Sequence, residues 1–227
     1  MIKKLIILLA LTTSIAYATP LTAQAWIVAD NNGRIFEASN MSEIRSGQSL
    51  TEIIPKKLYN KQLTRETLID LAIVKSDNTA AKMLCDYYPG GYDNCISAMN
   101  AKAKSLQMFN STFTDPTGLL STNVSTAQDL IKLVFAASKY PLIVEASNMD
   151  AVRWSISNKK NVEFRNTNTL VGPNNSFLVS KTGWITKSGG CIVMMMDTAN
   201  GIRTVVLLGS KNTKTRIPEA KMLSMLY

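Results

Sequence analysis

Hydrophobic residues follow two different spacings along this chain. Near both ends they form short runs or alternate with polar residues, which is typical of β-strands. In the middle they recur every three or four residues, as on one face of an α-helix. The first spacing predicts strands over residues 25–30, 34–38, 176–184, 191–197 and 202–209, and the second predicts helices over 64–74, 78–88, 92–106, 125–138 and 216–227.

Cap and turn residues separate these segments. Thr64 precedes a helical pattern and suits the N-cap position, because its hydroxyl can accept a hydrogen bond from a first-turn N–H. Ser125, followed three residues later by Gln128, has the spacing of a capping box. Tight turns are expected where glycine follows asparagine or proline, at 31–33, 89–91 and 200–201.

The order of the predicted elements indicates the fold class. Strands lie at both ends of the chain and helices lie between them, so we expect an α+β fold in which both termini build one antiparallel sheet around an inserted helical region. No repeat, low-complexity segment or linker interrupts the pattern. The sequence therefore predicts one domain over residues 19–227.

The first 18 residues have the organisation of a secretory signal. Lys3 and Lys4 precede an apolar stretch over 5–15, and Ala16-Tyr17-Ala18 provides a small-residue cleavage site. Eleven residues are too few to span a bilayer as a helix, and no cysteine follows for lipid attachment. The sequence predicts export to the periplasm without a stable membrane anchor.

Composition and charge limit the classes of molecule that the chain is expected to bind. The chain has 227 residues, 46% of them hydrophobic, and a formal net charge of +9. Basic residues are scattered singly and in pairs, without interleaved aromatic residues, so nucleic-acid binding is not expected. The positive charge fits either an acidic substrate or surface or a simple contribution to solubility.

Histidine and cysteine usage limits the chemistry. The chain has no histidine, which excludes a histidine-based triad, and its three cysteines do not form a metal pattern, so we expect neither a metal nor a cofactor. Cys85 and Cys95 lie symmetrically about Gly90, between two predicted helices. They form a disulfide in one interpretation and are separate buried thiols in the other. Cys191 is expected to be a buried strand thiol.

Two short motifs could carry chemistry. Ser76-Asp77-Asn78 could simply cap a helix, and Lys181-Thr182-Gly183 could simply end a strand at a glycine turn. In this order, in an exported chain without histidine, they match the S-x-N and K-T-G elements of serine enzymes that use S-x-x-K, S-x-N and K-T-G.

The chain resembles the D-alanyl-D-alanine carboxypeptidases and endopeptidases, the low-molecular-mass penicillin-binding proteins. The resemblance covers nearly all of the mature chain. Within the family, the chain is more similar to the shorter, endopeptidase-like branch. It implies a penicillin-binding-protein/β-lactamase-like fold, action on peptidoglycan stem peptides, and acylation by β-lactams if the nucleophile is active. The blocks that carry it are "AWIVADNNGRIFEASN", "SDNTAA", "YPGGYDNCISAMNAKAKSL", "FTDPTGL", "NVSTAQDL", "FRNTNTLVG" and "SKTGWITKSGGCIVMM".

The resemblance also implies roles for individual residues. Lys181 and Thr182, followed by Gly183, would bind the terminal carboxylate of the substrate from an edge strand. Ser76 would relay a proton to the leaving amine, and Asn78 would hold a substrate amide. The backbone N–H of Trp184 would help to form the oxyanion hole.

The nucleophile element departs from the family pattern. Alignment of "EIRSGQSLTE" places Ser49 at the nucleophile and Glu52 where the family has the basic lysine. Pro55 follows, and the segment to Ser76 is shorter than in the family, so the sequence predicts a truncated nucleophile helix. Ser49 would then lack both its base and its support.

Several functional interpretations remain open from the sequence. They are an active D,D-peptidase with an altered base, carboxypeptidase or endopeptidase; a non-catalytic protein that binds peptidoglycan peptides; the product of a decaying gene; and a β-lactamase. The blocks "AMNAKAK" and "DPTGL" favour the peptidase over the β-lactamase. The departure at Glu52 favours impaired catalysis.

Overall fold

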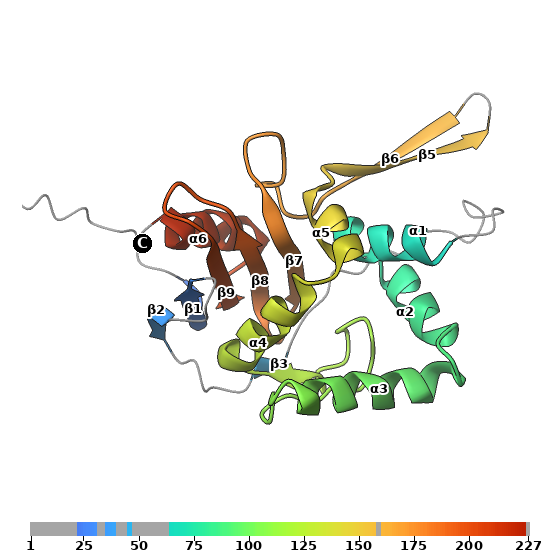
Figure 1. The fold of residues 1–227 in the computed structure, drawn as a ribbon, viewed down its shortest axis with the longest axis horizontal. Helices are drawn as coiled ribbons and strands as arrows, with labels where there is room; N and C mark the ends of the chain where they lie inside the picture. Colours follow the sequence, from blue (N-terminus) through green and yellow to red (C-terminus); the bar gives the residue numbers. More distant parts are fainter. Residues whose placement is uncertain (1–21, 31–34, 40–44, 47–63, 158–159, 226–227) are drawn as a thin grey trace, which may run out of the picture.

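The structure is a computed structural model, and it describes residues 22–30, 35–39, 45–46, 64–157 and 160–225. A five-stranded antiparallel sheet lies at its centre, in the order β2-β1-β9-β8-β7 (Figure 1). Both ends of the chain contribute to it, so the predicted fold class is confirmed. The strands are β1 (Ala25–Ala29), β2 (Ile35–Ser39), β7 (Phe177–Ile185), β8 (Gly189–Met196) and β9 (Arg203–Ser210).

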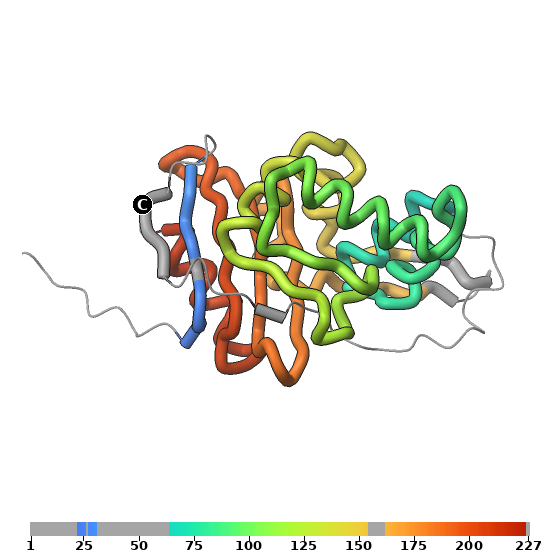
Figure 2. The backbone as a smooth tube through the Cα atoms, turned by 90° about the horizontal axis from the view of Figure 1, so that it is seen from below, coloured from blue at the N-terminus to red at the C-terminus, as the bar shows by residue number. Residues whose placement is uncertain are grey.

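The two ends of the chain meet in this sheet because β1 pairs with β9. Trp26 lies opposite Leu207, and Val28 lies opposite Val205. Figure 2 shows this blue N-terminal strand lying along the red C-terminal part of the chain. β8 and β9 are buried on both faces, which explains their nearly continuous apolar runs.

Helices cover both faces of the sheet. On one face α4 (Ala127–Ala137) packs Leu130 and Val134 against a cluster that includes Ile27 and Val206. On the other face α6 (Thr213–Met225) contributes Leu223 to a cluster that includes Phe177, Met194 and Leu207. Burial of these side chains on both faces stabilises the sheet and holds β7 at its edge.

The inserted region contains five further helical segments, and two of their caps are visible in hydrogen bonds. The Thr64 side chain accepts from the Thr67 N–H at 3.1 Å, as the sequence predicts, and Asp77 accepts from the Ala80 N–H at 2.9 Å. The segments are α1 (Arg65–Asp70), the π-helix η2 (Leu71–Lys75), α2 (Asn78–Asp86), α3 (Gly91–Ser105) and α5 (Pro141–Asn148).

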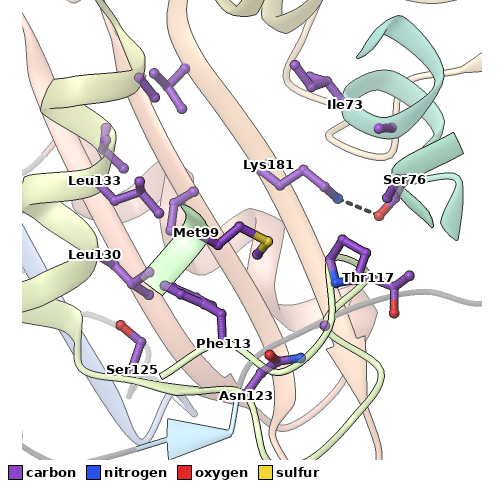
Figure 3. A pocket seen from close by; sticks show the side chains of 18 of the residues that line it. Ile73, Ser76, Met99, Phe113, Thr117, Asn123, Ser125, Leu130, Leu133 and Lys181 are labelled. Atoms are coloured by element: carbon purple, nitrogen blue, oxygen red, sulfur yellow. Dashed lines mark hydrogen bonds between the residues drawn. The ribbon is translucent and has the colours of Figure 1, made fainter. Parts of the chain in front are cut away.

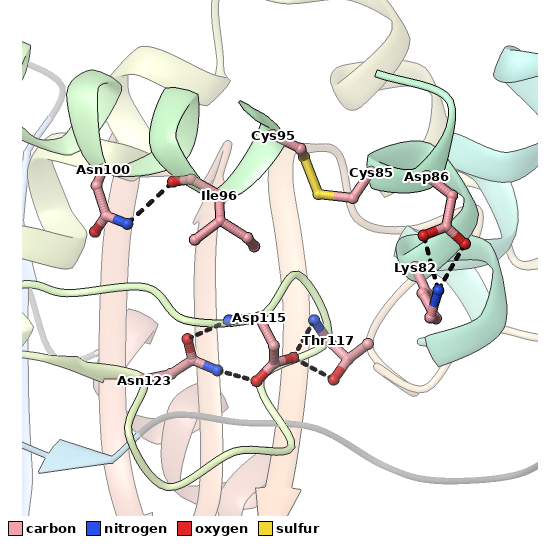
Figure 4. The surroundings of a disulfide bond; sticks show 9 residues. All are labelled: Lys82, Cys85, Asp86, Cys95, Ile96, Asn100, Asp115, Thr117 and Asn123. Carbon is pink, nitrogen blue, oxygen red and sulfur yellow. Dashed lines mark hydrogen bonds and ion pairs between the residues drawn. A yellow bond between two sulfur atoms is a disulfide. The ribbon is translucent and has the colours of Figure 1, made fainter. Parts of the chain in front are cut away.

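A disulfide joins α2 to α3, which confirms one of the two interpretations of the cysteines. Cys85 near the end of α2 bonds to Cys95 in α3, with their Cα atoms 5.2 Å apart (Figure 4). Gly90 and Gly91 both have φ of 83°, which a glycine adopts at little cost, and they turn the chain between the helices. Cys191 forms no disulfide, and it is a buried thiol in β8, as the sequence predicts.

The structure corrects two predicted helix starts. Thr126, not Ser125, caps α4, because its hydroxyl accepts from the Asp129 N–H at 3.1 Å while Ser125 pairs with Arg45 in a two-stranded ladder. This ladder joins β3 (Arg45–Ser46) to β4 (Val124–Ser125). The last helix begins at Thr213 rather than at Arg216. The carbonyl of the Asn212 side chain accepts from the N–H groups of Lys214 (2.8 Å) and Thr215 (3.1 Å), which starts the helix earlier.

Five of the described elements were not expected from the sequence. They are the short strands β3 and β4, the helix α5 and the two strands of a hairpin, β5 (Ala151–Ser157) and β6 (Lys160–Arg165). The hairpin projects from the body of the molecule (Figure 1). The signal segment over 1–18, the turn over 31–33, Ser49, Glu52 and Pro55 lie outside the described residues. Within the described ranges, every helix is too short or too polar to cross a bilayer.

Candidate active site

The structure brings Ser76 and Lys181 together, although 105 residues separate them in the sequence. Ser76 lies between η2 and α2, and Lys181 lies in β7 at the edge of the sheet. The Lys181 Nζ donates hydrogen bonds to the Ser76 Oγ and, at 2.6 Å, to the Thr182 carbonyl (Figure 3). The S-x-N and K-T-G motifs therefore face each other.

The backbone around Ser76 is unusual. Ser76 has φ of 61° and ψ of 42°, in the left-handed region that non-glycine residues rarely adopt. It directly follows the π-helix η2, and the N–H groups of both Ser76 and Asp77 are bonded to the Leu71 carbonyl. Such conformations cost about 1–3 kcal/mol and cluster at functional sites. In this conformation the Ser76 hydroxyl lies beside the Lys181 amine.

Arg216 is a second cation at the site, and sequence reasoning missed it. It comes from α6, is only 3% exposed, and its Nη1 donates to the Gly183 carbonyl at 2.6 Å. In the sequence it is one of many scattered basic residues, and no local pattern distinguishes it. Packing of α6 against the sheet is what brings it to the K-T-G strand.

Burial and Arg216 together change the electrostatics of Lys181. Burial lowers the pKa of Lys181, and the nearby Arg216 charge lowers it further, to about 7. Burial also lowers the pKa of Arg216. Among the described residues no carboxylate forms an ion pair with Lys181. An anion that enters the cavity would therefore meet Lys181, which lacks an acidic partner in the described part of the chain, and would also feel the charge of the nearby buried Arg216.

The other predicted site residues are placed differently. Asn78 lines the same cavity as Ser76 and Lys181. Thr182 is fully buried, and its hydroxyl donates to the Thr167 hydroxyl at 2.7 Å, so a substrate would have to displace this partner to use it. Gly183 and Trp184 follow Thr182 along β7, opposite Cys191 and Gly190 of β8. Ser49 and Glu52 lie outside the described residues.

Ser76 and Lys181 open into a cavity of about 400 Å³ (Figure 3). This volume lies within the range of about 300–1,000 Å³ found for small-molecule sites. Apolar side chains from α4, from the sheet and from the helical region form its inner part. They include Ile73, Met99, Phe113, Leu130, Leu133, Val134, Ala137, Ile143, Val179, Val193 and Leu208.

A hydrogen-bonded loop forms part of the rim of the cavity (Figure 4). The Asp115 carboxylate accepts from the N–H groups of Thr117 (2.6 Å), Gly118 (2.8 Å) and Leu120 (3.0 Å), and from the side chains of Thr117 and Asn123. Burial raises the pKa of Asp115, but these hydrogen bonds outweigh it and the net pKa is lowered. The carboxylate is therefore charged and holds the loop in one conformation.

The fold is shared with solved penicillin-binding proteins. Penicillin-binding protein D2 from Listeria monocytogenes, in its cefotaxime-bound form, aligns with a TM-score of 0.77 at 20% identity, over 91% of this chain and 97% of that one. Penicillin-binding protein 5 from Haemophilus influenzae also aligns with a TM-score of 0.77, at 22% identity, over 91% of this chain and 71% of that one. The architecture is therefore that of the penicillin-binding-protein class.

The sequence comparison places the chain within this class. The family model of the S11 peptidases, described as D-alanyl-D-alanine carboxypeptidase, matches residues 56–212. The D-alanyl-D-alanine endopeptidase of Escherichia coli is 41% identical over 166 residues, which cover 72% of this chain and 54% of that protein. For the D-alanyl-D-alanine endopeptidase of Pseudomonas aeruginosa, identity is 32% over 195 residues, with coverages of 82% and 58%.

The chain belongs to the D-alanyl-D-alanine carboxypeptidase family of serine peptidases. It spans somewhat more than half the length of the two endopeptidases, 54% and 58%.

Proposed function

We propose that this chain binds peptidoglycan stem peptides that end in D-alanyl-D-alanine, and that its hydrolytic activity at Ser49 is impaired. The observation that carries the binding proposal is Lys181 in the edge strand β7, which is hydrogen-bonded to Ser76 in the cavity, with the buried Arg216 charge close by at the Gly183 carbonyl. A terminal carboxylate is the group that such a cation would bind, and an extended peptide can lie along an edge strand. Asn78 lines the same cavity, where it would hold a substrate amide as the family resemblance implies.

Family membership supports the substrate class, and the predicted signal segment supports a periplasmic location. The cefotaxime bound to the related Listeria protein supports β-lactams as second ligands. Under this proposal residues 19–227 form one exported domain.

Binding of a stem peptide should depend on Lys181 and weaken as the pH rises. Loss of a hydrogen bond to a charged group costs about 1.5–3 kcal/mol, so Lys181→Met should weaken binding about 10- to 150-fold. Because the pKa of Lys181 is about 7, wild-type binding should weaken between pH 6 and pH 8 as the ammonium loses its proton. Calorimetry with an N-acetylated peptide ending in D-Ala-D-Ala measures both effects.

Two controls make this test specific. Lys187→Met changes an exposed lysine beyond β7 and should leave the affinity unchanged. The same peptide with a C-terminal carboxamide should bind weakly at every pH. Binding that is insensitive both to amidation and to Lys181→Met would contradict the proposed carboxylate site.

The impairment proposal rests on the sequence at Ser49. A serine hydroxyl needs a positioned base, and a glutamate with an ordinary pKa of about 4.3 is a weak proton acceptor for it. Lys181 would oppose a rise in that pKa by stabilising the charged carboxylate. The absence of histidine leaves Ser49 without the commonest alternative base.

We expect a fluorescent penicillin to label Ser49 weakly or not at all. We also expect Glu52→Lys alone not to restore labelling, because Pro55 and the shortened segment leave the serine without rigid support. In-gel fluorescence measures the labelling, with the E. coli endopeptidase as positive control. Rapid labelling that disappears in Ser49→Ala, or full rescue by the single substitution, would show an intact nucleophile.

A further inference from the structure

The pair of Ser76 and Lys181 has the composition of a nucleophile and its base. The Ser76 hydroxyl is within hydrogen-bonding contact of the Lys181 amine, and both groups line the cavity. A serine hydroxyl becomes a nucleophile when an adjacent base takes its proton, and a lysine can act as that base when its amine is neutral. Because burial and Arg216 bring the pKa of Lys181 to about 7, about half of it is neutral at pH 7.

We propose that Ser76 and Lys181 form a second reactive pair, in which carboxylic esters with an apolar acyl group acylate Ser76. This reaction goes beyond the proposed peptide binding, because it uses neither Ser49 nor a carboxylate on the ligand. It requires the neutral form of Lys181, whereas peptide binding requires the ammonium form.

The reaction is balanced with the groups at the site. Neutral Lys181 takes the proton of the Ser76 hydroxyl while Oγ attacks the ester carbonyl carbon. When the tetrahedral intermediate collapses, the bond from carbon to the alcohol oxygen breaks, and the Lys181 ammonium returns its proton to the leaving alcohol. Water, deprotonated by Lys181, then cleaves the acyl-Ser76 ester, releases the carboxylic acid and regenerates the hydroxyl.

The surroundings of Ser76 favour reactive esters over amides. Ser76 precedes the cap of α2 by one residue, so the positive end of the helix dipole lies beside the developing oxyanion. The N–H groups of Ser76 and Asp77, however, are both bonded to Leu71, so the N–H of the nucleophile itself is occupied. Loss of one oxyanion donor lowers the rate about 10²- to 10³-fold. An ester with a good leaving group can still react after such a loss, whereas an amide reacts too slowly.

The other charged groups near the pair do not replace Lys181 as a base. Asp77 uses one carboxylate oxygen to cap α2 at 2.9 Å from the Ala80 N–H, and its other oxygen is buried without a hydrogen bond to Ser76 or to any other described residue. Asp115 accepts hydrogen bonds from its own loop, which keep its pKa low. Arg216 comes from α6 and donates to the Gly183 carbonyl at 2.6 Å. Among the described residues, the Lys181 amine is the group that contacts the hydroxyl directly.

The apolar part of the cavity determines which acyl groups fit. Leu133, Val134 and Ala137 of α4 line the cavity together with Val193 and Leu208 of the sheet. Figure 3 shows Leu133 in the same cavity as Ser76 and Lys181. A linear acyl chain is a suitable occupant, since the lining is mostly apolar and a volume of about 400 Å³ lies in the range of about 300–1,000 Å³ found for small-molecule sites. Each buried methylene contributes up to about fourfold in kcat/KM. We therefore expect kcat/KM to rise from acetyl to octanoyl esters.

The test compares p-nitrophenyl acetate, butyrate and octanoate on the full chain, followed by peptide mapping after treatment with an octyl fluorophosphonate. We expect the phosphonyl adduct on Ser76 of the wild-type protein. Ser76→Ala and Lys181→Met should each lower kcat/KM for the octanoate by about 100-fold or more. Ser105→Ala, at an exposed serine at the end of α3 that does not line the cavity, is the matched control and should leave the rate unchanged.

Two further readouts separate this pair from a nonspecific surface. Ala137→Phe, which places a ring in the cavity, should lower the octanoate rate but not the acetate rate. Ala136→Phe changes the neighbouring α4 residue, which does not line the cavity, and should lower neither. The wild-type rate should rise through about pH 7, opposite to peptide binding. An adduct on Ser49, no adduct, or an unchanged rate in Ser76→Ala overturns the proposal, and none of these outcomes affects the peptide-binding result.

Discussion

Replacing Asp115 by alanine is expected to lower the free energy of unfolding by about 3 kcal/mol. The carboxylate accepts hydrogen bonds from three backbone N–H groups and two side chains, and it is 6% exposed. A buried donor that loses its partner costs about 1–3 kcal/mol. The total stays below the sum of these costs because Leu120 is 53% exposed and water can replace Asp115 there. Urea unfolding followed by circular dichroism measures the change.

The same carboxylate should make the wild-type protein sensitive to acid. Because the pKa of Asp115 is lower in the folded chain than its ordinary value of 3.8, its contribution is complete above that value. It is lost as the pH falls below about 4 and the folded carboxyl takes up its proton. In the Asp115→Asn protein, the free energy of unfolding should depend less on pH in this range. Asp150→Ala, which removes an exposed ion pair, should leave this dependence unchanged. An Asp115→Ala protein as stable as the wild type would contradict the role of the loop.

Removal of the disulfide should have a similar effect, about 2.7 kcal/mol. The bond closes a loop with a sequence separation of 10, and the loop-entropy relation gives this value at that length. For a chain of this size, the loss corresponds to a fall in melting temperature of about 5–10 °C. The measurement is thermal unfolding of the double variant Cys85→Ser/Cys95→Ser against the oxidised wild type.

A reductant provides the control for this prediction. Dithiothreitol should lower the melting temperature of the wild type to that of the double variant and should leave the double variant unchanged. Under denaturing conditions the oxidised wild type should present one thiol, that of Cys191, and the reduced protein three. Equal stability of the oxidised and reduced wild type would show that the bond contributes nothing.

The sequence by itself determined the elements whose signal is local. Strands at both ends, helices between them and the turn at Gly90 follow from residue spacing and backbone preference, which act over a few positions. The same short range explains why Cys85 and Cys95 could be paired across that turn. The S-x-N and K-T-G motifs were also recognised locally, from the residues at 76–78 and 181–183.

One helix boundary was decided by a competing contact. Ser125 has the spacing of a cap, but its pairing with β3 moves the start of α4 to Thr126. The hairpin formed by β5 and β6 was not predicted, although its residues alternate between apolar and polar and place Val152 opposite Phe164 and Trp154 opposite Val162. The two strands pair with each other and not with the main sheet, so the expectation of a single sheet from both termini did not include them.

Only the tertiary structure decided the chemistry of the site. Lys181 meets Ser76 across 105 residues, and Arg216 reaches Gly183 across 33. The tertiary structure also directs the Thr182 hydroxyl toward the Thr167 hydroxyl. These contacts depend on how the sheet, α2 and α6 pack, and on the burial that lowers the pKa of Lys181 to about 7. Residue spacing reports which face of an element is buried, whereas desolvation and charge proximity arise only when distant elements come together.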